Sequence, residues 1–325
     1  LDLMNKLSII PNNIGMANVC SVPLSYIFQR GQGIKVFSLV SKECYKLGYV
    51  IPELYKSKAV GNYEGAIVLK PKPGIYLDEP IAVLDYSSLY PSSMISHNLS
   101  HDSIVLDEEW MGKSGKERLE NMGYVVKDVY YDIYEYQVIG KRKNATKVNT
   151  GQKKCCRYVQ PKTEEDGEIK SENRAIIPRI LESLLAQRKK TRSRIKYKKL
   201  IKKDGKQYVG LLSEKDESTW KIKMDNDKVI ECKKDDVEKI QKQYNDFQNQ
   251  VWDGLQLAYK ITANSMYGSI GAKTSNISFI DIAASTTSVG RSMLETAADF
   301  ALKEYPDAEI TYGDTDSIFV NFHTK

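Results

Sequence analysis

Apolar residues recur along the chain at two spacings, and the spacing predicts which segments are helices and which are strands. In residues 1–57, including 1–7 and 33–46, apolar side chains return every three or four positions, as in helices with one buried face. Residues 280–304 show the same spacing. Short apolar runs at 81–84 and 310–322 predict a buried strand and a β-hairpin.

Two long helical patterns in the middle of the chain flank a segment of a different kind. Residues 176–201 and 235–267 predict two helices, which we expect to pack antiparallel as a hairpin. Within 204–236 lie three short β-prone runs, at 207–212, 219–224 and 228–233. We interpret this segment as a small β insertion, either an SH3- or Tudor-like barrel or a plain β-ribbon, and the pattern leaves both open.

The pattern is weakest between residues 107 and 173. This stretch is polar and predicts one strand region, 130–139. The chain as a whole predicts a mixed α/β (α+β) fold with an antiparallel sheet backed by helices, a helical hairpin and the small β insertion.

The charge of the chain is modest in total and concentrated in one place. Its 48 Lys and Arg residues against 42 Asp and Glu residues give a net charge of +6. From Arg188 to Lys203, however, ten of sixteen residues are basic and none is acidic. Such a run is usually a solvated helix face, but next to phosphate chemistry it favours a surface that binds anions.

The cysteines indicate a reducing environment. They are five in number and form no C-x2-C pair: Cys20, Cys44, Cys155, Cys156 and Cys232. An odd number of cysteines without a secretory leader predicts reduced intracellular thiols. Because no histidines lie near Cys155 and Cys156, we expect no zinc site there. No apolar run approaches the roughly 20 residues needed to span a bilayer, so we expect no membrane association.

Carboxylates stand at the ends of two predicted strands that are more than 220 residues apart. Asp85 ends the run 81–84, and Asp314 and Asp316 precede the run 318–320. Acids held together on a rigid sheet repel one another unless divalent cations lie between them, so the pattern indicates a two-metal site. A lone Asp would more simply cap a turn, but the D-x-D tip combined with the segment D-Y-x-S-L-Y-P at 85–91 disfavours that explanation.

A third segment supplies the opposite charge. Lys260, Asn264 and Tyr267 are spaced i, i+4 and i+7 and therefore share one face of the predicted helix. Acidic metal ligands together with a basic helix face indicate phosphoryl transfer.

At these three segments the chain resembles the B-family, or polymerase-alpha-like, DNA polymerases, and among them the delta-type members and those of large DNA viruses. Residues 85–92 (D-Y-S-S-L-Y-P-S) match palm motif A, 260–268 (K-I-T-A-N-S-M-Y-G) match fingers motif B, and 312–317 (Y-G-D-T-D-S) match motif C. Shorter matching stretches lie at 22–26, 30–32, 63–66 and 181–189. A chance match of three motifs in the order found in the family is improbable.

The resemblance implies two Mg2+ ions, for which Mn2+ could substitute. It assigns Asp85 and Asp316 as carboxylates that bridge both ions, and Asp314 as a weaker or transient ligand in the same catalytic set. The backbone carbonyl of Tyr86 would complete the coordination of one ion.

The resemblance also implies a nucleotide site. Arg188 and Lys260 form a phosphate clamp, and Arg192, one turn from Arg188, either joins the clamp or forms a surface salt bridge. The further members of this site are Asn264 and the backbone amides of Ser88, Leu89 and Tyr90, which would cradle phosphates.

By the same resemblance, two aromatic residues and a glycine would contact the sugar and the base of the nucleotide. Tyr90 occupies the position of the family's sugar gate, although a core tyrosine is the simpler explanation for any one of the 21 tyrosines. Tyr267 and Gly268 resemble the residues beside the nascent base pair, and Gly268 is also a candidate helix C-cap.

By the same resemblance the chain divides into four parts. These are the tail of an exonuclease domain with a linker (1–78), the first part of the palm (79–175), the fingers with the β insertion at about 204–236 (176–270), and the second part of the palm (271–325). The thumb is absent from this plan. The exonuclease acids lie outside it, so no proofreading function is carried over to this chain.

The expected activity is that of a DNA-directed DNA polymerase, which transfers deoxynucleotides from dNTPs to a primer 3'-OH on primer–template DNA. The viral resemblance implies replication inside a host cell, in the nucleus or at a cytoplasmic site, and a processivity clamp would bind through regions outside this chain. The alternative is a truncated, catalytically weak fragment that binds nucleic acid and nucleotides.

Overall fold

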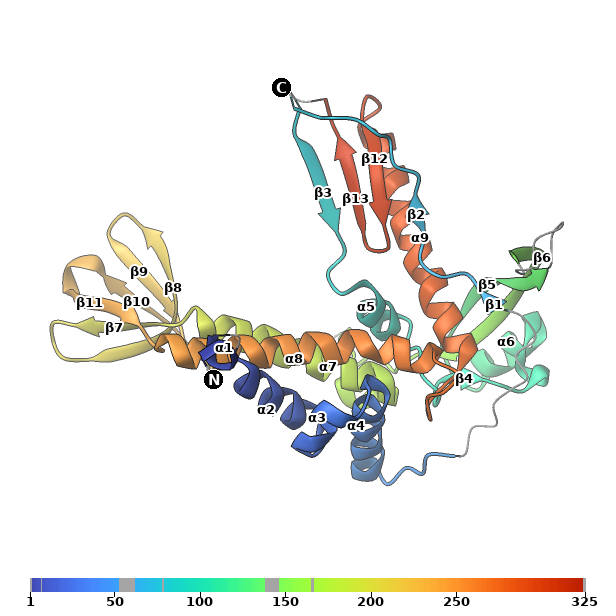
Figure 1. The fold of residues 1–325 in the computed structure, drawn as a ribbon, viewed down its shortest axis with the longest axis horizontal. Helices are drawn as coiled ribbons and strands as arrows, with labels where there is room; N and C mark the ends of the chain where they lie inside the picture. Colours follow the sequence, from blue (N-terminus) through green and yellow to red (C-terminus); the bar gives the residue numbers. More distant parts are fainter. Residues whose placement is uncertain are drawn as a thin grey trace. The chain divides into compact units, whose positions relative to one another are not determined.

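The computed structural model describes residues 2–6, 8–52, 62–77, 79–137, 146–164 and 167–323. The chain folds as two compact units, the first made of residues 1–31 and 183–263 and the second of 32–182 and 264–325. Helices α7 (Ile176–Ile195) and α8 (Asp246–Gly271) each contribute residues to both units (Figure 1).

Helices make up one part of the first unit. Three of them come from the N-terminal segment: α1 (Asp2–Lys6), α2 (Ile9–Cys20) and α3 (Leu24–Gln29). Met16 and Cys20 of α2 are buried together with Ala258 of α8. The two helices approach closely because Gly254 has no side chain, since a Cβ there would lie 2.0 Å from Oδ1 of Asn12.

The rest of the first unit is a five-stranded antiparallel sheet in the order β10-β9-β8-β7-β11, called the insertion sheet below. Its strands are β7 (Lys198–Lys202), β8 (Gln207–Asp216), β9 (Thr219–Lys223), β10 (Val229–Lys233) and β11 (Val237–Lys242), with the 3-10 helix η3 (Lys234–Asp236) before β11. Leu200, Ile222 and Cys232 form its core.

The insertion sheet begins earlier in the sequence and ends later than the predicted insertion, so the prediction was wrong at both ends. Residues 198–201, expected to end a helix, belong to β7, and 237–242, expected to begin one, form β11. Their lysine-rich sequences contain no helix breaker, but pairing with neighbouring strands outweighs their helix propensity. The sheet is larger than the predicted ribbon, and its described strands do not close into a barrel, because β10 and β11 are its edges.

Helix α9 (Ile280–Glu304) backs the main sheet of the second unit, in the order β2-β12-β13-β3, which we call the palm sheet (Figure 1). Its strands are β2 (Val68–Leu69), β3 (Ile81–Asp85), β12 (Glu309–Asp314) and β13 (Ser317–Asn321). Leu294 and Ala301 of α9 pack on Ile318 and Val320 of β13. The predicted helix over 280–304 and the predicted hairpin over 310–322 are confirmed.

The N-terminal half of α9 contacts a second sheet, in the order β1-β5-β6-β4. Its strands are β1 (Asn62–Tyr63), β4 (Ile104–Val105), β5 (Val126–Gln137) and β6 (Thr146–Val159). The hydroxyl of Tyr131 donates to Oδ1 of Asp281 (2.7 Å), and that of Tyr158 donates to Oγ of Ser285 (2.9 Å). The remaining elements are α4 (Gln32–Leu47), α5 (Leu89–Ser96), η1 (Glu108–Trp110), α6 (Gly112–Asn121) and η2 (Ser171–Asn173).

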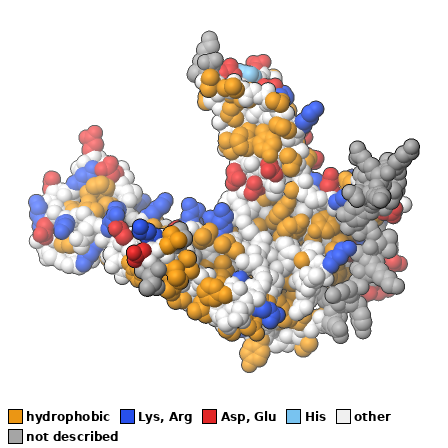
Figure 2. Space-filling model, viewed as in Figure 1, with side chains coloured by type: hydrophobic (Ala, Val, Ile, Leu, Met, Phe, Trp, Pro, Cys, Tyr) orange, Lys and Arg blue, Asp and Glu red, His pale blue; other side chains and the backbone are white. Residues whose placement is uncertain are grey.

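The structure extends or corrects three further predictions. The helix over 33–46 is confirmed as α4, and the strand region 130–139 is part of β5, although 138 and 139 lie outside the described residues. The strand at 81–84 is confirmed, but it is not buried: Val83 and Leu84 are 54% and 47% exposed because β3 is an edge of the palm sheet. Figure 2 shows hydrophobic side chains gathered over this sheet.

The overall class agrees with the prediction. Helices and antiparallel sheets are mixed in both units. No helix within the part of the chain that the structure describes is long and apolar enough to cross a membrane.

Candidate active site

Three strands of the palm sheet bring residues 85, 317 and 314 into one row at the same end of the sheet. Asp85, which ends β3, pairs with Ser317 at the start of β13, and Ser317 pairs with Asp314 at the end of β12. Residues directly opposite each other in antiparallel strands point to the same face, so the two acids lie on one face with Ser317 between them. Strands are spaced about 4.8 Å apart, which separates the backbones of the two acids by roughly 10 Å.

Asp316 lies beside Asp85 and Asp314, in the turn before β13. These three acids are called the acid row below. The amide of Tyr86 donates to the carbonyl oxygen of Asp316 (2.8 Å) and fastens the end of β3 to the turn. Thr315 has a φ of 54°, a left-handed conformation that β-branched residues rarely adopt. Its Oγ1 donates to Oδ1 of Asp314 (2.8 Å) and its amide donates to the carbonyl of Ile67 (3.0 Å), so the strained turn is held from two sides.

The carboxylates are neighbours without forming a closed cluster. Within the described residues, no group of three or more His, Cys, Asp or Glu side chains is placed to hold a metal ion. Asp85 is exposed, whereas Asp314 and Asp316 are half-buried. Mg2+ commonly binds through one or two carboxylates, with substrate phosphates and water as its other ligands, and these residues fit a site of that open kind.

Tyr90 is the second residue of α5 and lies close to the acid row. Its ring lies at a tilt on the ring of Tyr267, with the centroids 4.5 Å apart. Burial raises the pKa of Tyr90, Arg291 opposes this rise, and the carboxylate of Asp316 adds to it. Burial and a hydrogen bond with Tyr63 also raise the pKa of Tyr267. Both hydroxyl groups therefore stay protonated at neutral pH.

The turn between β3 and α5 carries the amides that were predicted to face phosphates. Ser88 has a φ of 54° and precedes the helix. Oγ of Ser92 donates to the carbonyl of Ser87 (3.0 Å), which closes the turn. The amides of Leu89 and Tyr90 lie in the first helical turn, where backbone donors have no intrahelical acceptor.

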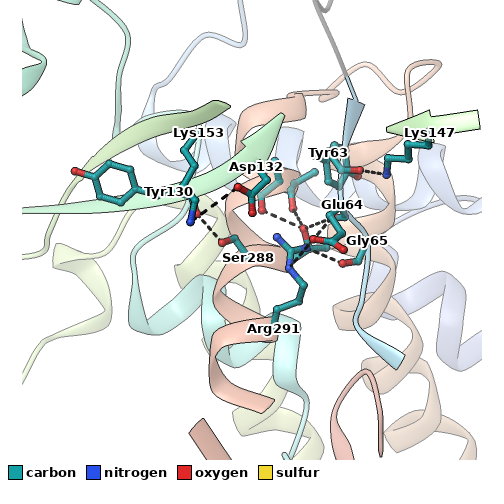
Figure 3. Close-up of polar contacts among 12 residues, drawn as sticks. Tyr63, Glu64, Gly65, Tyr130, Asp132, Lys147, Lys153, Ser288 and Arg291 are labelled. Carbon is teal, nitrogen blue, oxygen red and sulfur yellow. Dashed lines mark hydrogen bonds and ion pairs between the residues drawn. The ribbon is translucent and has the colours of Figure 1, made fainter. Parts of the chain in front are cut away.

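Helix α9 carries two residues of this region that the sequence did not single out. A Cβ on Gly290 would lie 3.0 Å from Cε1 of Tyr90. Next to it, Nη1 of Arg291 donates to the carbonyl oxygens of Glu64 and Gly65 (2.8 and 2.7 Å; Figure 3). A glycine inside a helical pattern was the available signal for the first, whereas nothing in the sequence distinguished Arg291.

The segment around Glu64 is also held by other residues. Nζ of Lys147 in β6 donates to the carbonyl of Tyr63 (Figure 3), and Oγ1 of Thr287 donates to that of Glu64 (2.9 Å). The backbone of this segment is therefore fastened to both β6 and α9.

In the first unit the predicted clamp residues share one pocket of about 290 Å³. It is lined by Arg188, Arg192, Ile195, Lys196, Asp253, Gln256, Leu257 and Lys260. Nε of Arg188 donates to Oε1 of Gln256 (3.5 Å). Burial, together with the positive charge of Arg192, lowers the pKa of Arg188. The pocket therefore gathers four cationic side chains, those of Arg188, Arg192, Lys196 and Lys260, beside the carboxylate of Asp253.

The predicted salt bridge of Arg192 is not found among the described residues. Its neighbours Lys190 and Arg194 instead pair with Asp225, at 3.8 and 2.9 Å. Arg192 and Lys260 are both exposed, so their side chains are accessible at the pocket.

Helix α8 carries the other predicted residues with the expected periodicity. Lys260, Asn264 and Gly268 are all exposed, and Tyr267 is half-buried against Tyr90. The helix continues to Gly271, so Gly268 is not a C-cap.

Comparison with known proteins adds to this geometry. Residues 22–209 and 226–325 match the model of the protein family described as "DNA polymerase family B". The chain belongs to DNA polymerase family B. The gap between the matched stretches, 210–225, falls in β8 and β9 of the insertion sheet. Residues 1–21 also lie outside the matched stretches, whereas β7, β10 and β11 of the insertion sheet lie within them.

Family B relatives align along nearly the whole chain. The DNA polymerase of Pyramimonas orientalis virus is 48% identical over 326 residues, which cover 99% of this chain and 25% of the viral protein. The DNA polymerase delta catalytic subunit of Dictyostelium discoideum is 33% identical over 332 residues, covering 99% and 22%. The chain thus spans about a quarter of the length of these curated relatives.

A solved structure shares the fold. The family B DNA polymerase from the hyperthermophilic archaeon Pyrobaculum calidifontis aligns with 98% of this chain and 30% of its own, with a TM-score of 0.51 and 22% sequence identity.

Proposed function

We propose that this chain is the catalytic part of a DNA-directed DNA polymerase, which adds deoxynucleotides from dNTPs to the 3'-OH of a primer on a DNA template. The observation that carries the proposal is the acid row, assembled from strands more than 220 residues apart in the sequence. Membership of family B and the cationic pocket support it.

The acid row would hold two Mg2+ ions, or Mn2+ in their place. Asp85 and Asp316 are proposed to bind both, with Asp314 as a weaker ligand and the carbonyl of Tyr86 completing one site. When bound, such ions lower the pKa of the primer hydroxyl and neutralise charge on the leaving pyrophosphate. The hydrogen bond from Thr315 to the carboxylate of Asp314, and that from the Tyr86 amide to the backbone carbonyl of Asp316, fix the turn that carries these acids.

The cationic residues would bind the triphosphate. Arg188 and Arg192 offer forked donors and Lys260 offers a point charge, so together they orient the phosphates and offset their charge. Asn264 would line the same helix face. The amides of Ser88, Leu89 and Tyr90 are proposed to receive phosphate oxygens at the start of α5.

Tyr90 would lie under the sugar and leave no room for a 2'-hydroxyl, which selects deoxynucleotides by steric exclusion. Tyr267 and Gly268 would lie beside the new base pair. Gly268 suits a close approach, because nothing lies within 4 Å of the position of a Cβ at this residue.

The biological setting is also a proposal. The relative that is 48% identical is a viral DNA polymerase, which supports a role in viral DNA replication inside a host cell, in the nucleus or at a cytoplasmic site. Primer–template DNA is the proposed partner, and a processivity clamp would be bound by regions outside this chain.

Incorporation of a single nucleotide tests the proposal. A labelled primer–template is mixed with excess protein, Mg2+ and one dNTP at low salt, where phosphate contacts are strongest. We expect template-matched extension, and a loss of about 10³-fold or more in Asp316→Asn and Asp85→Asn, because an amide is a poor ligand for the proposed ions.

Asp299→Asn, an exposed change on α9, is the matched control and should extend the primer as the wild type does. Undiminished extension by Asp316→Asn would contradict the assignment of the acids. Binding of DNA by the wild type without any extension would instead favour a fragment that binds nucleic acid without turnover.

A further inference from the structure

We infer that Gly290 of α9 is a positioning residue for Tyr90 and thereby sets how strictly the site excludes ribonucleotides. The inference rests on the proposed function, in which Tyr90 lies under the sugar of the incoming nucleotide. It concerns a helix that is separated from α5 by about 200 residues of sequence.

A side chain at position 290 would press against the ring of Tyr90. A Cβ on Gly290 would lie 3.0 Å from Cε1 and 3.5 Å from Cδ1 of Tyr90, and 3.3 Å from Cδ2 of Leu89. Carbon atoms pack at about 3.5–4.0 Å, so a methyl group at this position displaces its neighbours by a few tenths of an ångström.

Helix α5 cannot readily move away as a unit, because its surroundings tie it to α9. The hydroxyl of Tyr86 donates to the carbonyl of Met293 (3.1 Å), and Oγ of Ser93 donates to Sδ of Met293 (3.7 Å). Both contacts lie within one turn of Gly290 on α9. The displacement therefore falls on the ring of Tyr90 itself.

Helix α9 is also prevented from retreating. Arg291 binds the carbonyl oxygens of Glu64 and Gly65, and Oγ of Ser288 donates to the carbonyl of Tyr130 (2.6 Å; Figure 3). These bonds fix the residues on both sides of Gly290 to other parts of the second unit. The backbone of Gly290 thus acts as a rigid stop against one edge of the ring.

A shift of the ring changes the space beside it. Steric exclusion of one hydroxyl depends on a few tenths of an ångström, and forcing a side chain from its preferred rotamer costs enough to alter a rate several-fold. In Gly290→Ala we expect the ratio of kcat/KM for a dNTP to that for the matching rNTP to change by about three- to tenfold, through KM more than kcat.

A double-mutant cycle tests this coupling. Single-nucleotide incorporation is measured with dNTP and rNTP for the wild type, Gly290→Ala, Tyr90→Ala and the double variant. Ser292→Ala, an exposed change two residues away on the same helix, is the control. The melting temperature of each variant is measured alongside to show that it is folded at the assay temperature, because the helix propensity gained by alanine offsets only part of the cost of the contact with Tyr90.

The expected result is a changed ratio in Gly290→Ala, no change in Ser292→Ala, and no further effect of Gly290→Ala once Tyr90 is alanine. An unchanged ratio in Gly290→Ala, or an equal effect with and without the Tyr90 ring, would overturn the inference alone. A wild-type protein that incorporates neither nucleotide would overturn the proposed function and this inference with it.

Discussion

Arg157 shows how a single buried charge is stabilised in this protein. Only 2% of its side chain is exposed, and its Nε and Nη2 donate to the two carboxylate oxygens of Asp128 (2.7 and 2.8 Å). Its Nη1 donates to the carbonyls of Trp110 and Gly112. The guanidinium therefore joins β5 and β6 to the start of α6, and its charge is fully paired.

Removing the carboxylate of Asp128 should be costly, because a charged group would stay buried with one partner missing. We expect Asp128→Asn to lower the free energy of unfolding by about 3–5 kcal/mol. Asp132→Asn is the control, since Asp132 pairs with the exposed Lys153 at 3.9 Å and should lose less than about 1 kcal/mol. Denaturant unfolding measures both, and equal losses would contradict the distinction.

His97 makes stability depend on pH. Burial, aided by the charge of Lys127, lowers the pKa of His97 to about 4, whereas an unfolded chain has a histidine pKa of about 6.5. Below that value the unfolded chain binds the proton first, so stability falls between about pH 6.5 and pH 4, by at most about 3 kcal/mol.

His97→Gln should remove this contribution. The free energy of unfolding is compared at pH 7 and pH 4.5 for the two proteins, and we expect the wild type to lose more stability than the variant. A variant that loses as much as the wild type would show that other groups cause the acid sensitivity.

At the scale of elements, β8 is shared by two halves of the insertion sheet. Its first residues, through Gly210, pair with β7, and from Leu211 onward they pair with β9. A Cβ on Gly210 would lie 2.2 Å from the carbonyl oxygen of Lys223, a backbone atom that cannot turn aside. The change of partner thus depends on a residue without a side chain.

Gly210→Ala should destabilise the insertion sheet by about 1–3 kcal/mol, as overpacking against backbone does. Thermal and denaturant unfolding would report the loss. Gly33→Ala in α4 serves as the control, because nothing lies within 4 Å of the added Cβ and the change should be neutral or slightly stabilising. Similar effects at the two positions would refute the steric explanation.

The sequence predicted elements well where one face of each is regularly apolar. This holds for α9 and for the β12–β13 hairpin, whose apolar side chains meet in the core of the second unit. The apolar pattern did not predict β7, where Leu200 is the one fully buried residue and its neighbours are mostly lysines. Whether this segment is a strand depends on the strands it pairs with, of which β11 is distant in the sequence. Local propensity carries no information about such partners.

The same reason limits what could be known of the candidate site. Motifs located the acids of the row and Tyr90, since their residue types are chemically distinctive. Gly290 was missed because its role is a contact with a residue about 200 positions away, and a single glycine in a helix has several explanations. The roles of the predicted site residues stay predictions until the variants are assayed.

At the scale of the whole molecule, the insertion sheet is attached at a narrow point. The amide of Gln243 donates to the carbonyl of Tyr197 (3.2 Å), and Lys198 pairs with Lys242. The chain therefore leaves α7 and returns to α8 through adjacent residues, and the sheet has its own core.

Replacing residues 198–242 by a short turn should leave the helices folded. We expect an unchanged helical circular dichroism signal and a single cooperative unfolding transition, with a modest loss because Lys190 and Arg194 no longer pair with Asp225. A chain that lost cooperative unfolding would show that the sheet is required for the fold of the helices. A variant that only replaces Asp225 by Asn separates the lost ion pairs from the lost sheet.

The pairing of β3 with β13 affects how the protein folds while the ribosome is still synthesising it. A ribosome adds roughly 5–20 residues per second, so β3 waits about 10–45 s before Ser317, more than 220 residues later, is synthesised. During that interval both edges of β3, and with them its apolar residues Val83 and Leu84, are open to other chains. Translation speed and chaperone supply should therefore affect the yield of folded protein more strongly than for a domain whose strands pair as they emerge.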